Sequence, residues 1–208
     1  LLDQEVYVLD VRANSDFAAA HVPGSINIAL SGQFASWAGT IMGLSARPVL
    51  VADTAEEYEE ARMRLARVGI EDPRGFLKGG IAAWKQAGFP VAQLPQIAAN
   101  ELHDQLRSGS LQVLDVRREP EWQAGHISEA DWFPLDRFKV SAPEVDLSQP
   151  LAVHCQGGYR STIACSILRR AGIENVINVI GGFDAWRMAG LPVEDAAVET
   201  AGKSTSRA

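Results

Sequence analysis

The sequence contains two related copies of one segment of about 100 residues. The first copy opens with "VYVLDVRANSDFAAAHVPGSINI", and the second opens with "LQVLDVRREPEWQAGHISEADWF". In both copies an aspartate precedes a histidine by the same spacing, from Asp10 to His21 and from Asp115 to His126. Because this period has the size of a domain and is too long for a solenoid repeat, a duplicated domain is predicted.

Each copy alternates short β-branched runs with amphipathic helical stretches. The expected strands include "VYVLDV", "PVLVA", "LQVLDV", "LAVHC" and "NVINVIG", and the expected helices include "EEYEEARMRLARVG" and "STIACSILRRAG". Such alternation favours an α/β fold with a mostly parallel sheet flanked by helices. We expect two tandem α/β domains, at residues 1–92 and 93–194, and a disordered low-complexity tail at residues 195–208.

The two copies differ at their start. The second copy carries "IAANELHDQLRSGS" before its first long strand, whereas the first copy has only "LL" at that place. We therefore expect the first domain to be truncated at its N-terminus and the natural protein to extend upstream.

Composition excludes several classes of function. The formal net charge of -7 argues against nucleic acid or an anionic membrane surface as the main partner. No apolar run reaches the length of a membrane span, and the first residues do not read as a signal peptide. Two cysteines cannot form a disulfide framework, so a reducing cytoplasm is the expected compartment.

The strongest candidate for chemistry is Cys155, in the stretch "HCQGGYRST". This thiol ends a predicted strand directly before a predicted helix, where free backbone N–H groups and the helix dipole favour a thiolate. Glycines in such a loop permit positive φ angles and leave room for an anion, and an arginine adds a cation for an anionic donor. Cys155 is the predicted nucleophile, and the predicted substrate-binding residues are Gln156, Gly157, Gly158, Tyr159 and Arg160.

Loop length separates two enzyme classes that use such a cradle. Four residues lie between Cys155 and Arg160, one fewer than in cysteine phosphatases. The smaller ring that this loop forms around the thiol suits an added sulfur atom better than a phosphoryl group. His154 imitates the "HC" of a phosphatase, and we interpret it as structural. A phosphatase or arsenate reductase remains the less favoured enzymatic alternative.

The first copy lacks these features. Asp53 stands where Cys155 is expected to align, and Glu56 and Glu57 follow it without any glycine. We expect an inactive domain, with a carboxylate nucleophile as the alternative. Cys165, on the helix after the loop, is a poor candidate for a resolving thiol because helix geometry keeps it below the cradle.

Residues that recur in both copies are expected to maintain the fold, because one copy is inactive. They are Asp10, Asp115, His21, His126, Trp84 and Trp186. Phe34 and Trp37 belong either to the core or to an interface with a domain upstream.

The motifs "CQGGYRS", "LDVR…GH" and "GGFDAW…AGLPV" resemble the rhodanese (thiosulfate sulfurtransferase) family, as a tandem pair over nearly the whole chain. More narrowly, "FASWAG" and "HCQGGYRST" are similar to the rhodanese half of persulfide dioxygenase–rhodanese fusions, in which a metallo-β-lactamase-like domain comes first. The four histidines are scattered, so no metal or other cofactor is expected in this chain; iron would belong only to that upstream domain. The stretch "GHISEADWF", expected to lie beside the site, departs from the family, because it lacks the Pro-Gly-Ala that is usual there.

This resemblance implies sulfane-sulfur transfer through a Cys155 persulfide. Thiosulfate or a low-molecular-weight persulfide would be the donor, and a thiol such as glutathione, sulfite or cyanide would be the acceptor. The chain would then serve a larger sulfide- or persulfide-oxidising protein, without nucleic acid or membrane as partner. The alternative from another class is a non-catalytic sulfur-carrying or docking module for an attached dioxygenase.

Overall fold

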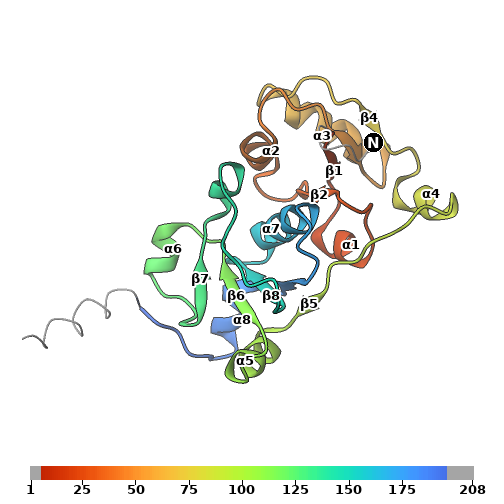
Figure 1. Ribbon diagram of the computed structural model, residues 1–208. Coiled ribbons are helices and arrows are strands. Elements are labelled where there is room, and N and C mark those ends of the chain that lie inside the picture. Colours follow the sequence, from red (N-terminus) through yellow and green to blue (C-terminus); the bar gives the residue numbers. More distant parts are fainter. Residues whose placement is uncertain (1–5, 196–208) are drawn as a thin grey trace, which may run out of the picture.

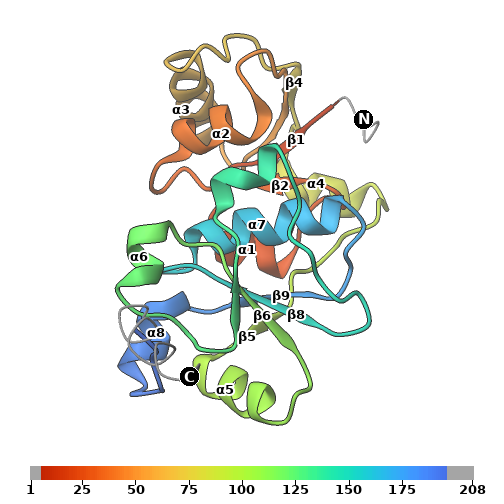
Figure 2. The same ribbon diagram turned by 60° about the vertical axis from the view of Figure 1, so that its left-hand side comes forward.

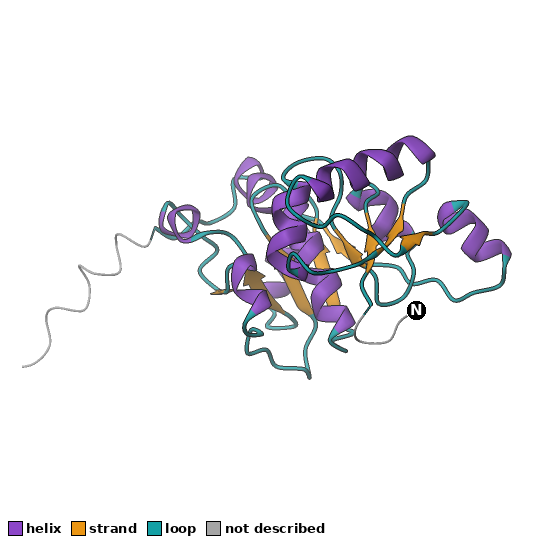
Figure 3. Ribbon diagram, turned by 90° about the horizontal axis from the view of Figure 1, so that it is seen from above, coloured by secondary structure: helices purple, strands orange, loops and turns teal. Residues whose placement is uncertain are grey.

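The computed structural model describes residues 6–195; of the predicted tail at 195–208, residues 196–208 lie outside the described residues. The first half forms a parallel sheet in the order β2-β1-β3-β4. Its elements are β1 (Val8–Asp10), α1 (Asn14–Ala19), β2 (Ile26–Asn27), α2 (Phe34–Met42), β3 (Val49–Val51), α3 (Ala55–Ala66), β4 (Gly75–Phe76) and α4 (Gly80–Gln86). Helices lie on the faces of the strands (Figure 3).

The second half repeats this topology and adds one strand. Its parallel sheet has the order β5-β9-β8-β6-β7. Its elements are β5 (Gln96–Ile97), α5 (Ala99–Arg107), β6 (Gln112–Asp115), α6 (Glu119–Gln123), β7 (Ala130–Trp132), the 3₁₀ helix η1 (Leu135–Lys139), β8 (Leu151–His154), α7 (Tyr159–Arg170), β9 (Val176–Val179) and α8 (Gly182–Met188). The predicted α/β fold with two parallel sheets flanked by helices is confirmed.

Helix α7 joins the two domains. It packs on β8 and β9 of its own sheet and on β2 of the first domain, and both ribbon views show it between the two halves (Figures 1 and 2). Asn14 donates its side-chain amide to Gly158 O and Thr162 Oγ1, at 3.2 and 3.1 Å. One cluster of buried apolar side chains includes Leu9 and Leu50 from the first domain and Ile163 from α7. One core cluster therefore spans the two copies.

The recurring polar residues hold each copy together. Arg12 pairs with Asp10 at 2.6 Å, and Arg117 pairs with Asp115 at 2.7 Å, all four being buried. His21 stacks on Phe17, and His126 stacks on Trp122, with ring centroids 3.9 and 3.7 Å apart. Trp186 is buried and Trp84 is half-buried, and each indole donates to a proline carbonyl, Pro192 O and Pro90 O respectively.

Strand register corrects the alignment of the two copies by one residue. Asp10 is paired with Val51, and Asp115 is paired with His154. Ala52 is therefore the counterpart of Cys155, and the expected match of Asp53 to Cys155 is wrong. Asp53 instead corresponds to Gln156, because Arg12 lies 3.9 Å from Asp53 as Arg117 lies 3.3 Å from Gln156. The first copy is one residue shorter between this point and the helix N-cap.

Among residues 6–195, no helix has the length and apolar character that a bilayer crossing requires.

Candidate active site

Cys155 lies directly after β8, at the carboxyl end of the central strand of the second sheet. Its Sγ accepts a hydrogen bond from Gly158 N at 3.2 Å and lies 3.7 Å from Ser161 Oγ. Ser161 is oriented by its own hydrogen bond to Asn178 Oδ1 at 2.7 Å. Cys155 is only 1% exposed, so a donor reaches the sulfur only if the loop or its neighbours move.

Two glycines allow this loop to form. Gly158, the N-cap of α7, has a φ of +97°, a left-handed conformation that a side chain would strain. Gly182, the first residue of α8, lies so close that an added Cβ would stand 2.3 Å from Cys155 O. Gly157 does not have a positive φ. It is exposed at the loop tip.

The loop leaves several backbone donors open. Among the described residues, no acceptor takes the N–H groups of Gln156, Gly157, Tyr159 or Arg160. Together with the Gly158 N–H that already contacts Sγ, these groups belong to the loop and first turn of α7 that directly follow the thiol. Amides arranged in this way stabilise an anion without any charged side chain.

The Gln156 side chain braces the loop from one side. Its Oε1 accepts from Arg117 Nη1 at 3.3 Å, and its Nε2 donates to Asp184 of α8. The Arg117 guanidinium is itself fixed by Asp115 and lies over the Phe183 ring, 3.8 Å from the ring centroid. Gln156 therefore connects the loop to α8.

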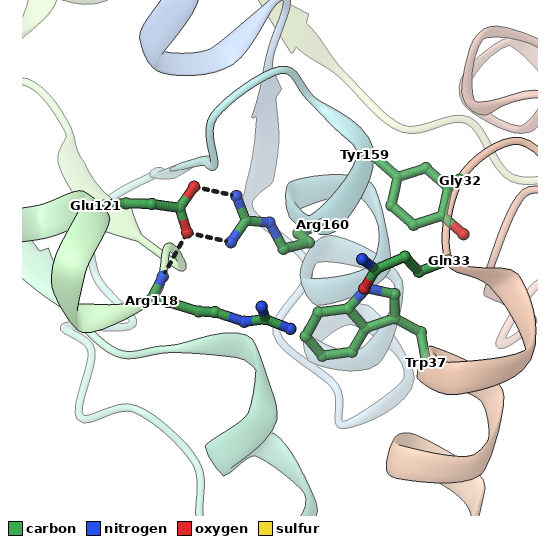
Figure 4. Close-up of a pocket in the computed structure, with 7 residues that line it drawn as sticks. All are labelled: Gly32, Gln33, Trp37, Arg118, Glu121, Tyr159 and Arg160. Carbon is green, nitrogen blue, oxygen red and sulfur yellow. Dashed lines mark hydrogen bonds and ion pairs between the residues drawn. The ribbon is translucent and has the colours of Figure 1, made fainter.

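The guanidinium of Arg160 is already paired with Glu121. Arg160 Nη1 and Nη2 donate to the two carboxylate oxygens of Glu121 at 2.7 and 2.6 Å (Figure 4). The bidentate bond and the nearby charge hold the pKa of Glu121 below its ordinary value. Glu121 also accepts from Arg118 N at 3.0 Å, which fixes it at the start of α6.

Tyr159 faces the first domain. Its hydroxyl donates to Ala29 O at 2.8 Å, and its ring lies against Gly32. Burial raises the pKa of this phenol well above its ordinary value, so the hydroxyl stays protonated.

A pocket of about 380 Å³ opens between the domains beside Arg160. Its walls come from α2 and the preceding loop on one side, and from α6 and the start of α7 on the other (Figure 4). The residues that line it are Gly32, Gln33, Trp37, Arg118, Glu121, Tyr159 and Arg160. A second pocket of about 350 Å³ lies on the other side of Glu121, lined by Arg117, Gln156 and Phe183 among others.

Sequence reasoning missed Glu121 and the part that the first domain plays in this pocket. The signal for Glu121 was a capping pattern, in which a glutamate three residues after Arg118 closes the first turn of a helix. Trp37, left open between core and interface, is buried yet lines the pocket.

His154 and Cys165 lie behind the loop. His154 Nδ1 is 3.3 Å from Cys155 O, and its Nε2 is 3.5 Å from Asp115 Oδ2. Complete burial lowers the pKa of His154, which favours the neutral ring. Cys165 is fully buried on α7, and burial raises its pKa far above the ordinary value. A protonated, buried thiol is a poor nucleophile.

No group of three or more His, Cys, Asp or Glu side chains within residues 6–195 is arranged to hold a metal ion.

The corresponding loop of the first copy closes on itself. Asp53 N and Thr54 N both donate to Glu57 Oε2, at 2.9 and 3.4 Å, and Thr54 Oγ1 accepts from Glu57 N at 3.2 Å. This capping box gives the loop amides an internal carboxylate as partner. With Ala52 in place of a thiol, the first copy has neither a nucleophile nor an open cradle.

Comparison with known proteins identifies a family that both halves match. Residues 1–87 and 98–189 each match the family described as "Rhodanese-like domain". An uncharacterized protein, slr1261, from Synechocystis is 34% identical over 96 residues, which cover 46% of this chain and 54% of that protein. The chain thus spans about half the length of that relative.

Two further relatives have functional names. A protein named "Sulfurtransferase" from Allochromatium vinosum is 31% identical over 81 residues, covering 39% of this chain and 76% of that protein. The crystal structure of a thiosulfate sulfurtransferase from Pseudomonas aeruginosa aligns with 92% of this chain and 41% of its own, at 26% identity and a TM-score of 0.42.

Proposed function

Because the chain belongs to the family of rhodanese-like domains, we propose that it is a sulfurtransferase that carries sulfane sulfur as a persulfide on Cys155. The relative named as a sulfurtransferase supports a role in sulfur transfer. The observation that carries the assignment to this residue is the contact of Cys155 Sγ with Gly158 N, beside loop amides that have no protein partner among the described residues.

The proposed reaction has two half-reactions. The Cys155 thiolate attacks the outer sulfur of the donor; a new S–S bond forms, and the donor's own bond to that sulfur breaks. Thiosulfate would leave as sulfite with the bonding electron pair, and an organic persulfide would leave as its thiolate. A thiol, sulfite or cyanide acceptor then attacks the outer sulfur and regenerates the Cys155 thiolate.

The loop amides would bind the negative outer sulfur of the intermediate. Gly158 N already contacts Sγ, so this N–H group would not have to turn towards the sulfur when the charge appears. Gly158 N lies nearest to the thiol, and Gln156 and Gly157 would supply the next N–H groups. Tyr159 and Arg160 line the adjacent pocket, where the remainder of the donor would bind.

We further propose the wider setting that the motifs imply. Glutathione persulfide is a suitable donor, and a cytoplasmic sulfide- or persulfide-oxidising protein with a dioxygenase domain is the proposed context. The nearly complete burial of Cys155 favours one alternative, a module that carries or docks sulfur without turnover.

Turnover by the isolated chain tests the proposal. We expect steady-state transfer from thiosulfate or glutathione persulfide to cyanide, with ping-pong kinetics. Cys155→Ser should lower kcat/KM at least about a thousandfold because the nucleophile is lost. The matched control is Cys165→Ala, which removes the other thiol of the chain and should keep transfer within about threefold.

Transfer that survives Cys155→Ser would refute the assignment of the nucleophile. Sulfur bound to Cys155 without any turnover would favour the carrier alternative. Hydrolysis of an aryl phosphate that depends on Cys155 would instead favour a phosphatase.

A further inference from the structure

The ion pair between Glu121 and Arg160 is the structural feature that the proposed reaction leaves unexplained. Both carboxylate oxygens of Glu121 engage the guanidinium, and the two side chains are only 30% and 15% exposed. A bidentate pair that is partly removed from water is stronger than a typical surface ion pair. The cation that the sequence assigned to an anionic donor therefore already has an anionic partner.

The ion pair between Glu121 and Arg160 changes the charge of the pocket in which a sulfur donor would bind. The pocket beside Arg160 is lined by two cations, Arg118 and Arg160, and one anion, Glu121. Thiosulfate carries two negative charges in a small volume, so it would have to displace the Glu121 carboxylate or bind close to it. Either route costs free energy, because like charges repel strongly where water is partly excluded.

The pocket is otherwise suited to an organic molecule. Its volume of about 380 Å³ lies in the range of pockets that hold small organic ligands. Trp37 and Tyr159 provide aromatic walls, and Gln33 provides an amide next to them (Figure 4). The persulfide group of an organic donor carries one negative charge, on the terminal sulfur, which the loop amides would receive. The carbon skeleton can contact the aromatic walls, and the carboxylates of glutathione are several bonds away from the sulfur.

We infer that Glu121 is a specificity-determining residue: by occupying Arg160, it disfavours thiosulfate and selects organic persulfides as sulfur donors. This inference rests on the proposed sulfurtransferase function and adds the class of donor. Only the step from donor to Cys155 is affected, because the second half-reaction begins from the same persulfide whatever the donor was.

The test compares Glu121→Gln with Asp16→Asn. Glutamine keeps the hydrogen bond from Arg118 N and the side-chain volume but removes the charge. Asp16 occupies the same position in the first turn of α1 that Glu121 occupies in α6. It is exposed and lies in the first copy, which has no thiol in its loop. We expect Glu121→Gln to raise kcat/KM for thiosulfate at least about tenfold and to change that for glutathione persulfide less than about threefold. Asp16→Asn should leave both values unchanged.

Inhibition by inorganic sulfate gives a second readout. As a dianion without sulfane sulfur, sulfate should inhibit Glu121→Gln at least about tenfold more strongly than the unmodified chain. Glu121→Met, a second uncharged side chain of similar volume, should shift the donor ratio in the same direction if glutamine impairs folding.

The possible failures are distinguishable. If both donors load Cys155 and their ratio of kcat/KM is the same before and after Glu121→Gln, the inference is overturned and the sulfurtransferase function stands. If neither donor loads Cys155 in any of the folded proteins, the proposed function and the inference fall together.

Discussion

The two strand-to-helix loops show how one backbone turn can be closed or left open. In the first copy the Glu57 carboxylate accepts from Asp53 N and Thr54 N. In the second copy the loop is one residue longer and holds two glycines, and Gly158 N donates to Cys155 Sγ. The turn thus presents amides to an acceptor in both copies. In the first copy the acceptor is the Glu57 carboxylate, and in the second it is the Cys155 sulfur.

The buried ion pairs next to the two loops are the same in both copies, although the loops differ. The buried pairs Asp10–Arg12 and Asp115–Arg117 have nearly the same geometry, although only one of them stands beside a thiol. The same buried pair is therefore present whether or not the neighbouring loop holds a thiol.

The largest effect on stability is expected at the glycines beneath the two loops. Gly182→Ala would place a Cβ 2.3 Å from Cys155 O in a left-handed backbone, and should lower the free energy of unfolding by about 3 kcal/mol. Gly80→Ala, with 2.9 Å to Ala52 O, should cost about 2 kcal/mol. Urea unfolding measures both changes.

Gly172→Ala is the matched control for these two variants. Its φ is +93°, but no atom lies within 4 Å of an added Cβ, so only about 1 kcal/mol is expected. Equal losses in all three variants would show that the close approach to the loops is unimportant.

Acid should weaken the first copy through His21. Burial lowers the pKa of His21 to about 4, below the ordinary value of 6.5. Between these two values the unfolded chain binds a proton that the folded chain does not. Stability is therefore highest above about pH 6.5 and falls by about 2 kcal/mol as the pH drops towards 4. Urea unfolding at pH 7.5 and 4.5 measures this loss, and His21→Gln should reduce it; an unchanged loss would place the cause elsewhere.

The smallest effect is expected when the closed loop is opened. Glu57→Ala removes the carboxylate from Asp53 N and Thr54 N and should lower the free energy of unfolding by about 1 kcal/mol. Sulfur transfer should stay unchanged, because Ala52 offers no thiol. The neighbouring, exposed Glu56→Ala should cost less than about 0.5 kcal/mol. A loss of transfer in Glu57→Ala would mean that the first loop contributes to the reaction.

Much of the fold could be predicted because it depends on patterns of neighbouring residues in the sequence. Alternation of strands and helices predicted both parallel sheets, and the glycines after Cys155 predicted a turn at a helix N-terminus. The alignment of Asp53 with Cys155 failed because similarity of letters does not locate a single deleted residue. The register of Asp10 with Val51 and of Asp115 with His154 does locate it.

The pocket could not be predicted because long-range packing creates it. β6 and β8 are neighbours in the sheet, which brings Glu121, shortly after β6, next to Arg160, shortly after β8. Trp37 reaches the pocket from the other domain, through the packing of α2 on η1. None of these three side chains is close to the others in the sequence.

The most direct test locates the sulfur. After incubation with glutathione persulfide or thiosulfate and removal of excess donor, mass spectrometry of the intact chain and of its peptides measures the added mass and its position. The account predicts one additional sulfur atom per chain, on Cys155, and none in Cys155→Ser. An added sulfur on Cys165, or a Cys155 that stays unmodified in folded protein with both donors, would contradict it.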